Sequence, residues 1–318
     1  MLPDPLPSLK PVVPFEPMLA TKIPQGSQWM AQVKWDGVRV LTYYDGFNVR
    51  LFNRKLHERT MQYPELVDIN RYCAARSVIL DGEVIALVKG TPSFHQVMKR
   101  DGIRLAVKVE QARRVTPVVY MVFDVLYVNG NWVLEHPLTV RQRILAEIIK
   151  WQEQVQTVEN FTDGPRLFAA VENAGLEGVV CKRIDSPYAI GGKDERWQKV
   201  KNYRDVVAVV GGVTYRDHVV NAVLLGLYDH ESRLWYIGHA GTGRLTRADW
   251  RALTERVRAL IIRERPFYNQ PQRLSGATWV KPEITAKVQF LEWTAGMTLR
   301  QPSIQAFTEV PPESCLFE

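Results

Sequence analysis

Short runs rich in β-branched and aromatic residues recur along this 318-residue chain, and they constrain its fold more than any other feature. Runs of this kind, bounded by turn-forming residues, are typical of β-strands. Apolar residues at helical spacing and stop signals interrupt them, which predicts helices over residues 140–155 and 167–174. The sequence therefore predicts mixed α and β structure up to about residue 204. The expected strands there cover residues 29–33, 38–44, 48–53, 78–88, 118–128, 178–182 and 197–200.

The pattern of expected helices and strands changes after Arg204. A helix is expected over residues 246–263, because Thr246 and Asp249 have the spacing of a capping box and an apolar stripe follows them. Several short strands around one helix suit a small β-barrel such as the OB fold. We therefore expect two domains, 1–204 and 205–318. The strands expected in the second domain cover residues 206–215, 222–228, 234–239, 286–293 and 298–300.

Charge and cysteine usage narrow the class of protein. The formal net charge is +7 and the sequence pI is about 9.3, which makes nucleic acid the leading candidate for a partner. Cys73, Cys181 and Cys315 lie far apart, which argues against a zinc ribbon or a disulfide scaffold and fits a reducing cytosol. The first 17 residues predict an extended, proline-rich arm rather than a signal peptide, and no apolar stretch reaches membrane-spanning length.

The hexapeptide KWDGVR, at residues 34–39, lies between two expected strands, where a turn would present Lys34. A lysine becomes a nucleophile only after its ammonium loses a proton, which burial or nearby positive charge promotes. Gly37 would allow a nucleotide to approach the backbone closely. The same segment also fits a polar hairpin turn, because Asp-Gly is a common turn dipeptide. Alone, KWDGVR leaves both interpretations open.

Three further segments place charged residues on apolar strands. Glu83 must be paired or bind a metal or ribose if it is buried. Glu177 and Lys182 lie at the two ends of one strand and could bracket a phosphate and its divalent cation. Lys199 and Lys201 alternate, so they share a strand face, which is unfavourable unless an anion lies between them. Each segment also fits an ordinary strand with charged positions. The segments are LDGEVIAL, EGVVCKR and WQKVKNY, at residues 80–87, 177–183 and 197–203.

Taken together and in this order, the segments resemble the motifs of the covalent nucleotidyltransferase superfamily, which includes DNA ligases, RNA ligases and mRNA capping enzymes. The resemblance runs from about Phe15 to Tyr203. KWDGVR matches the motif that carries the nucleotidyl-lysine, and Asn53-Arg54 matches the next motif, which supplies an arginine. The DGE triplet ending at Glu83 matches the third. VFDVLYVNG, at residues 122–130, resembles the segment whose aromatic residue stacks on the base.

Within the superfamily, the motif sequences are most similar to those of ATP-dependent DNA ligases of bacterial end-joining repair, the ligase D type. PFEPMLA at residues 14–20, KWDGVR and FDVLYVNG carry this similarity. That subfamily lacks a large N-terminal DNA-binding domain, and none would fit before Lys34. NAD-dependent ligases carry a cysteine-rich zinc module, which three scattered cysteines cannot supply. The implied fold class is α+β: a nucleotidyltransferase (adenylation) domain with antiparallel sheets and flanking helices, followed by an OB-fold β-barrel domain.

The resemblance implies an enzyme that seals 5′-phosphate/3′-hydroxyl breaks in duplex DNA, in DNA repair. Lys34 would attack the α-phosphate of ATP and release pyrophosphate. The AMP would move to the 5′-phosphate of the break, and the 3′-hydroxyl would then displace it. The expected cofactors are ATP, as AMP donor, and Mg²⁺ or Mn²⁺, with Glu177 and Glu83 as metal ligands. The expected ATP-binding residues are Lys34, Asp36, Arg39, Arg54, Glu83, Phe123, Lys182, Lys199 and Lys201.

The C-terminal part departs from the family. Members end their OB domain with a motif that begins at an arginine and closes on an Asp-Lys pair. Here Arg300 begins the motif, but Thr308-Glu309 stands at its closing position. We therefore expect self-adenylylation to be slow or to be assisted by another residue. Arg300 is expected to act in DNA binding or adenylylation.

The expected partner is nicked or broken duplex DNA, with a Ku-type end-binding protein as a second partner implied by the resemblance. The resemblance also implies a monomer that works at the nucleoid in a bacterial cytoplasm, away from membranes. An RNA ligase or a GTP-using capping-type nucleotidyltransferase remains an alternative, because Phe123 alone does not decide the base. An inactive nucleic-acid clamp is an alternative of another class, supported only by the altered C-terminal motif.

Overall fold

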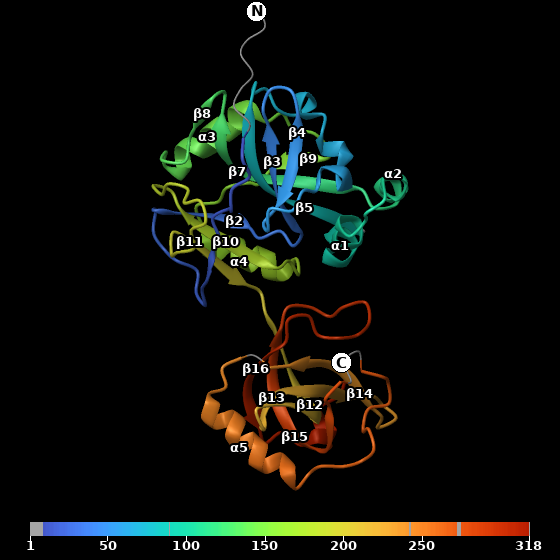
Figure 1. Cartoon of the computed structure of the whole chain (residues 1–318). Coiled ribbons are helices and arrows are strands. Elements are labelled where there is room, and N and C mark those ends of the chain that lie inside the picture. Colours follow the sequence, from blue (N-terminus) through green and yellow to red (C-terminus); the bar gives the residue numbers. More distant parts are fainter. Residues whose placement is uncertain (1–8, 89, 242, 272–274, 318) are drawn as a thin grey trace, which may run out of the picture. The chain divides into compact units, whose positions relative to one another are not determined.

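The computed structural model describes residues 9–88, 90–241, 243–271 and 275–317. The chain divides into two compact units, Met1–Asn202 and Tyr203–Glu318, two residues ahead of the boundary expected after Arg204 (Figure 1). Part of the expected N-terminal arm, residues 1–8, lies outside the described residues. The remainder of the arm runs without regular structure to the short strand β1, Met18–Leu19.

The first unit is built on two β-sheets. One is seven-stranded, with the order β4-β3-β5-β7-β8, β6 pairing with β5 and β9 with β7; the other is four-stranded, with the order β1-β11-β10-β2. Most neighbours are antiparallel, as expected. The strands are β2 (Trp29–Val33), β3 (Val38–Tyr44), β4 (Val49–Asn53), β5 (Val78–Val88), β6 (Thr91–Pro92), β7 (Val118–Val128), β8 (Asn131–Trp132), β9 (Val155–Thr157), β10 (Gly178–Arg183) and β11 (Trp197–Lys201).

The two sheets of the first unit pack face to face. Leu41 of β3, Ile79 of β5 and Trp197 of β11 share one buried cluster, and Phe15 from the N-terminal arm completes it. Helices cover the outer faces. Helices α1 (Phe94–Asp101) and α3 (Leu138–Ile148) pack on the seven-stranded sheet, and α4 (Gly164–Asn173) packs on the four-stranded sheet. The site residues are therefore carried by two packed sheets whose outer faces are covered by helices (Figure 1).

Four helices of the first unit differ from the sequence prediction. Helices α1 and α2 (Ala106–Val115) were not predicted, because their buried positions carry few apolar residues: Val97, Arg100 and Asp101 are buried on α1, and Val109 on α2. Helix α3 ends at Ile148 rather than at 155, since Ile149 is extended and bridges to Cys73. Helix α4 begins earlier than expected, because the Asp163 side chain accepts a hydrogen bond from the Arg166 amide and caps the first turn.

The second unit is a five-stranded antiparallel sheet with the order β14-β13-β12-β15-β16. Just after β14, Gly243 bridges to Ile304 of β16, which brings the two edges of the sheet together and indicates a barrel. Helix α5 (Arg247–Arg258) begins with the predicted capping box of Thr246 and Asp249. These features confirm the predicted α+β class with an OB-like second domain. The strands are β12 (Arg204–Arg216), β13 (Val219–Tyr228), β14 (Leu234–Ala240), β15 (Thr278–Phe290) and β16 (Ser303–Thr308).

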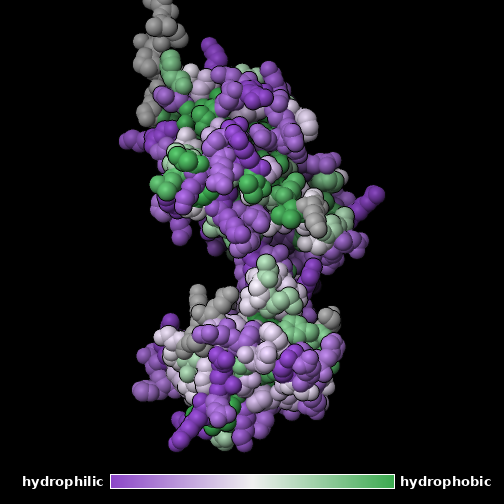
Figure 2. Space-filling model, turned by 90° about the vertical axis from the view of Figure 1, so that its right-hand side faces the viewer, coloured by the Kyte–Doolittle hydropathy of each residue, from purple (hydrophilic) through white to green (hydrophobic). Residues whose placement is uncertain are grey.

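Two strands of the second unit were predicted wrongly. Strand β15 begins at Thr278 rather than at 286. Its first part was not predicted, because the polar stretch Lys281–Glu283, with its central proline, is not typical of a strand. The expected strand at 298–300 is only an isolated bridge, Trp293 to Leu299, and the neighbouring strand is β16. None of the described helices is long and apolar enough to cross a membrane. On the face shown in Figure 2, hydrophilic residues predominate and hydrophobic ones form scattered patches.

Candidate active site

Strand alternation turns the predicted site residues of the four-stranded sheet toward the seven-stranded sheet. Ala31, Cys181 and Val200 belong to the cluster packed against α4. Their neighbours along each strand must point the other way, because successive side chains alternate between faces. Gln32 of β2, Lys182 of β10 and the lysines of β11 therefore face the interior between the two sheets.

Lys34 follows β2 directly, and its amide donates to the Gly178 carbonyl at 2.9 Å, which holds it beside β10. The Lys34 ammonium pairs closely with Glu177, whose second oxygen lies 3.4 Å from the Lys201 Nζ. Burial and the charges of Lys34 and Lys201 lower the pKa of Lys199. Lys34 and Lys201 thus share one carboxylate, and Lys199 lies close enough for the charges of both to act on it. This local excess of positive charge suits a bound anion such as a phosphate.

Glu83 of β5 belongs to the same cluster. Burial raises the pKa of its carboxyl group to about 8, against the opposing effect of the Lys34 and Arg39 charges, while Glu177 and Asp36 raise it further. No group of three His, Cys, Asp or Glu side chains in the described part of the chain is arranged to hold a metal ion. Two nearby carboxylates still fit Mg²⁺, which usually keeps several waters and binds few protein ligands.

Arg39 of β3 is held by bidentate hydrogen bonds to Asp81. Its Nε and a terminal nitrogen donate to the two oxygens of Asp81 at 2.9 and 2.6 Å. The Tyr188 hydroxyl donates to Asp81 at 2.7 Å, and Arg39 donates to that hydroxyl at 3.3 Å. Asp81 is fully buried, so its charge is matched by Arg39. The bidentate pair sets the orientation of the guanidinium, whose central carbon lies 5.2 Å from the Phe123 ring centroid.

Lys182 is buried between two aromatic rings. Its Nζ lies 4.4 Å from the Phe123 ring centroid and 4.0 Å from that of Trp197. Burial lowers the pKa of this amine to about 7, although Asp124 and Asp81 act in the opposite direction. The amine makes no hydrogen bond to any residue that the structure describes. A buried donor left without an acceptor is costly, so the position invites a ligand atom that can accept.

Two predicted arginines pair with carboxylates other than Glu177 and Asp81. Arg54 is more than half exposed, and its guanidinium is 3.5 Å from Glu16 of the N-terminal arm. Arg300 belongs to the second unit, where it donates to Glu292 at 2.8 Å. At the closing position of the C-terminal motif, the Thr308 hydroxyl lies 2.8 Å from that of Thr285. No lysine or arginine occurs in the sequence from residue 301 to 318.

Sequence reasoning missed several residues of the site. Asp81 could have been found, because it alternates with Glu83 on β5 and shares its face. Tyr188 and Trp197 enclose Arg39 and Lys182, yet no local pattern marks them. Tyr188 is 107 positions from the carboxylate that it binds, so only the folded chain reveals the pair.

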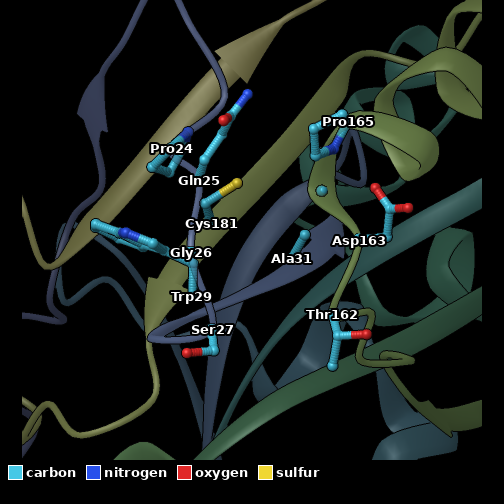
Figure 3. A pocket seen from close by; sticks show the side chains of 11 residues that line it. Pro24, Gln25, Gly26, Ser27, Trp29, Ala31, Thr162, Asp163, Pro165 and Cys181 are labelled. Atoms are coloured by element: carbon cyan, nitrogen blue, oxygen red, sulfur yellow. The ribbon is translucent and has the colours of Figure 1, made fainter.

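A separate pocket of about 380 Å³ lies on the α4 side of the four-stranded sheet (Figure 3). Ala31 and Cys181 are among its lining residues, and both lie on the opposite strand face from Gln32 and Lys182. Asp163 and Pro165 at the start of α4 line it from the other side. None of the predicted site residues lines this pocket, so it is distinct from the lysine cluster.

Two family models match the chain. The ATP dependent DNA ligase domain matches residues 16–201, which include the predicted site residues of the first unit. The ATP dependent DNA ligase C terminal region matches residues 216–310. The two matched segments fall in the two compact units.

Curated relatives and solved structures agree with this match. The multifunctional non-homologous end joining protein LigD of Mycobacterium tuberculosis is 33% identical over 298 residues, which cover 90% of this chain but only 37% of LigD. DNA ligase C1 of Mycolicibacterium smegmatis is 31% identical, with 87% of this chain and 83% of that protein covered. A structure titled mycobacterial DNA ligase D complexed with ATP and MES is 31% identical, with a TM-score of 0.54 over 96% of this chain and 98% of that one. The chain belongs to the family of ATP-dependent DNA ligases.

Proposed function

We propose that this DNA ligase joins 5′-phosphate and 3′-hydroxyl ends of duplex DNA through an AMP bound covalently to Lys34. The observation that carries the proposal is the pairing of both Lys34 and Lys201 with Glu177, beside Lys199, whose pKa their charges lower. One amine in this group can act as nucleophile while its neighbours hold the phosphate. A solvated row of strand lysines would not need a shared, nearly buried carboxylate.

The chemistry at Lys34 follows from these contacts. The Lys34 amine must lose a proton before it attacks the α-phosphate of ATP, and Glu177 is the acceptor already in contact with it. A nitrogen–phosphorus bond forms, and the bond from the α-phosphorus to the leaving pyrophosphate breaks. Lys199 and Lys201 lie where negative charge gathers on the phosphoryl oxygens, and preorganised cations there stabilise the transition state.

The remaining residues of the first unit would bind the nucleotide. Phe123 would stack on the base, and the buried amine of Lys182 would donate to the nucleotide beside that ring. The pair of Arg39 and Asp81 would present its guanidinium in one orientation. Arg54 is exposed and only loosely held by Glu16, so it is free to meet a phosphate of ATP or of the break. Asp36 and Glu83 complete the expected ATP contacts.

Glu83 and Glu177 would hold the Mg²⁺ or Mn²⁺ ion. The raised pKa of Glu83, about 8, supports this role, because a bound dication would favour the ionised carboxylate. When bound, the metal would neutralise phosphate charge and help to orient the phosphates.

The substrate would be nicked or broken duplex DNA, bound largely through its phosphates by the basic chain. We further propose a role in end-joining repair, as a monomer at the nucleoid in the bacterial cytoplasm, with a Ku-type partner. The similarity to LigD supports this role, although the chain spans only 37–38% of the LigD relatives. Arg300 would contact DNA or assist adenylylation. Because Thr308-Glu309 stands where the motif would close on a basic residue, self-adenylylation would be slower than nick sealing by the charged enzyme.

The test is covalent labelling. Purified protein is incubated with Mg²⁺ and α-labelled ATP or GTP, separated by denaturing electrophoresis, and chased with nicked DNA. Label from ATP should attach to the wild type and to a matched control, Lys22→Ala at an exposed lysine, and should leave as the nick is sealed. Lys34→Ala should abolish the label.

Persistent labelling of Lys34→Ala would contradict the assignment of the nucleophile. Label from GTP alone would favour the capping-type alternative. Absence of label in the wild type with either nucleotide would favour an inactive clamp and make the altered C-terminal motif the decisive feature.

A further inference from the structure

The Tyr188 hydroxyl joins segments that lie far apart in the sequence. Tyr188 belongs to the loop between β10 and β11 and is almost fully buried. Its hydroxyl accepts from the Phe15 amide of the N-terminal arm at 3.0 Å and from a terminal nitrogen of Arg39 at 3.3 Å. It donates to the Asp81 carboxylate of β5 at 2.7 Å. The hydrogen-bonding capacity of the hydroxyl group is therefore used entirely within the protein.

These contacts leave the hydroxyl proton one direction. A tyrosine hydroxyl carries one proton and can accept with its lone pairs. Phe15 and Arg39 both approach it with N–H groups, which can only donate, so the proton must point at Asp81. The bond from Tyr188 reaches Asp81 at Oδ2, the same oxygen that accepts from Arg39. The N-terminal arm thus helps to fix the polarity of a hydrogen bond in the candidate site.

Tyr188 is held through its backbone, its ring and its hydroxyl. Its amide donates to the Leu134 carbonyl at 2.8 Å. Its ring packs edge-on against those of Phe15 and Trp197, with centroids 6.0 and 5.6 Å away. Backbone hydrogen bonds on either side of Phe15 also join the arm to this loop. A residue that orients another must itself be fixed in this way.

Arg39 is the side chain that this arrangement orients. Its Nε and one terminal nitrogen are taken by Asp81, which leaves the other terminal nitrogen, Nη1, to meet a ligand. The last side-chain torsion of an aspartate is soft, so the carboxylate could turn if Arg39 alone held it, and the guanidinium would turn with it. The bond from Tyr188 holds Asp81 from a second direction and so fixes the plane of the pair.

We infer that Tyr188 is a positioning residue: through Asp81 it holds the Arg39 guanidinium in the orientation that binds ATP, and the N-terminal arm keeps its proton directed at Asp81. The inference rests on the proposed function, in which Arg39 contacts the nucleotide. A side chain that is already oriented loses less conformational entropy on binding, which raises affinity. Tyr188 acts on the nucleotide only through Arg39.

Tyr188→Phe tests this role, because it keeps the ring and removes only the hydroxyl. Self-adenylylation is followed with α-labelled ATP at several concentrations, which gives the half-maximal ATP concentration, the maximal rate and the fraction of enzyme that becomes labelled. The half-maximal concentration should rise about tenfold, with the maximal rate within about threefold of the wild type. A merely structural defect would instead lower the labelled fraction, because unfolded protein cannot bind ATP. Partial unfolding does not hide the result, because the half-maximal concentration does not depend on how much enzyme is folded.

Tyr43→Phe is the matched control. Tyr43 is also almost fully buried, and its hydroxyl accepts from the Val12 amide of the same arm at 2.9 Å. Among the described residues, no hydrogen bond joins the Tyr43 hydroxyl to Asp81 or Arg39. The half-maximal ATP concentration should therefore stay within about twofold of the wild type. A rise as large as that in Tyr188→Phe would assign the effect to the arm in general and overturn the role of the Tyr188 hydroxyl.

A double variant asks whether Tyr188 acts through Arg39. Arg39→Lys keeps a positive charge opposite Asp81 but has no planar fork to orient. In that background, Tyr188→Phe should raise the half-maximal ATP concentration by less than about twofold further, because both changes remove the same feature. Effects that multiply would show that Tyr188 acts by another route and would overturn the inference.

The outcomes separate this inference from the proposed function. An unchanged half-maximal ATP concentration in Tyr188→Phe, with labelling intact, overturns the inference and leaves the lysyl-AMP mechanism standing. Label that persists in Lys34→Ala overturns the proposed nucleophile. The ATP dependence of Tyr188→Phe still decides the inference in that case, because it is measured on whichever lysine is labelled.

Discussion

The two units of the molecule differ in how their interiors treat charge. The first unit buries several charged side chains almost completely, whereas none of the buried residues described in the second unit is charged. A barrel needs only apolar packing to keep its shape. A nucleotide site needs charges held at fixed orientations, which burial and pairing provide. The buried charged residues of the first unit are Asp81, Arg100, Asp101, Asp124, Arg141 and Lys182.

Within the first unit, the buried charges are of two kinds. Arg141 and Asp124 are fully buried and joined by a two-point pair at 2.8 and 3.0 Å, and Arg141 also donates to the His136 and Ser186 carbonyls. Lys182 is equally enclosed, but its amine lies between two ring faces and makes no hydrogen bond to a described residue. The first arrangement is satisfied within the protein. The second is left for a ligand to complete.

The largest effect is expected from breaking the satisfied pair. Arg141→Met leaves the Asp124 carboxylate buried without its partner and should lower the free energy of unfolding by about 3–5 kcal/mol. Chemical denaturation of the full chain measures this loss. The double variant Arg141→Met with Asp124→Leu removes both charges and should recover most of it. A loss below about 1 kcal/mol in the single variant would mean that the pair is not as enclosed as the structure shows.

A somewhat smaller loss is expected from the apolar core of the second unit. Ile284 of β15 is fully buried, and Ile284→Ala should lower the free energy of unfolding by about 3 kcal/mol, through lost burial and a cavity. Because no ionisable group is involved, the loss should be the same at pH 6 and pH 9. A loss that varied strongly with pH would contradict the view that, unlike the first unit, the second has no buried charge in its described core.

Lys182 should make the stability of the first unit depend on pH. Its pKa is about 7 in the folded chain, below its ordinary value of 10.5, so between these values the unfolded chain binds more protons. Stability must therefore rise with pH, and the full penalty for the charged amine is present below pH 7. The wild type should gain up to about 1.4 kcal/mol per pH unit relative to Lys182→Met between pH 7 and 9.

Denaturation at several pH values in that window gives the slope. The exposed variant Lys22→Met is the control and should show no such slope. A flat difference between the wild type and Lys182→Met would show that Lys182 keeps an ordinary, charged environment.

The smallest effect is expected at the surface of the second unit. Arg258 and Glu255 form an ion pair at 2.7 Å, but about two thirds of each side chain is exposed. Solvent and salt screen such pairs, so Arg258→Ala should change the free energy of unfolding by less than about 0.5 kcal/mol. Thermal denaturation at low and high salt measures it. A loss above about 1 kcal/mol would contradict this prediction. It would show that surface ion pairs contribute more to the stability of the second unit than its apolar core leads us to expect.

Much of the fold could be predicted from the sequence where neighbours along the chain decide the structure. The expected strands at 29–33, 38–44, 78–88 and 118–128 coincide with β2, β3, β5 and β7. Helix α5 began where its capping box predicted. Helices α1 and α2 escaped prediction, because their burial depends on distant partners. Arg100 of α1, for example, is buried among acceptors far from it in sequence: Glu65 accepts at 2.8 and 2.9 Å, and the Gln62 and Thr116 carbonyls accept at 3.1 Å.

The candidate site was predictable as a set of residues, through the order of its motifs, but its arrangement was not. Strand alternation placed Lys199 and Lys201 on one face in advance. It could not show that Glu177 joins Lys34 to Lys201, because that contact spans 143 positions between Lys34 and Glu177. Nor could it show that Arg54 pairs with Glu16 and Arg300 with Glu292.

The sequence by itself determined which residues carry the chemistry and which way their side chains leave each strand, since both depend on the residue and its nearest neighbours. Only the tertiary structure decided what those side chains meet. The pairing of Arg39 with Asp81 and the enclosure of Lys182 between two rings both depend on packing two sheets against each other. Hydrogen bonds and burial act over a few ångströms in space, and only folding brings together groups that lie far apart along the chain.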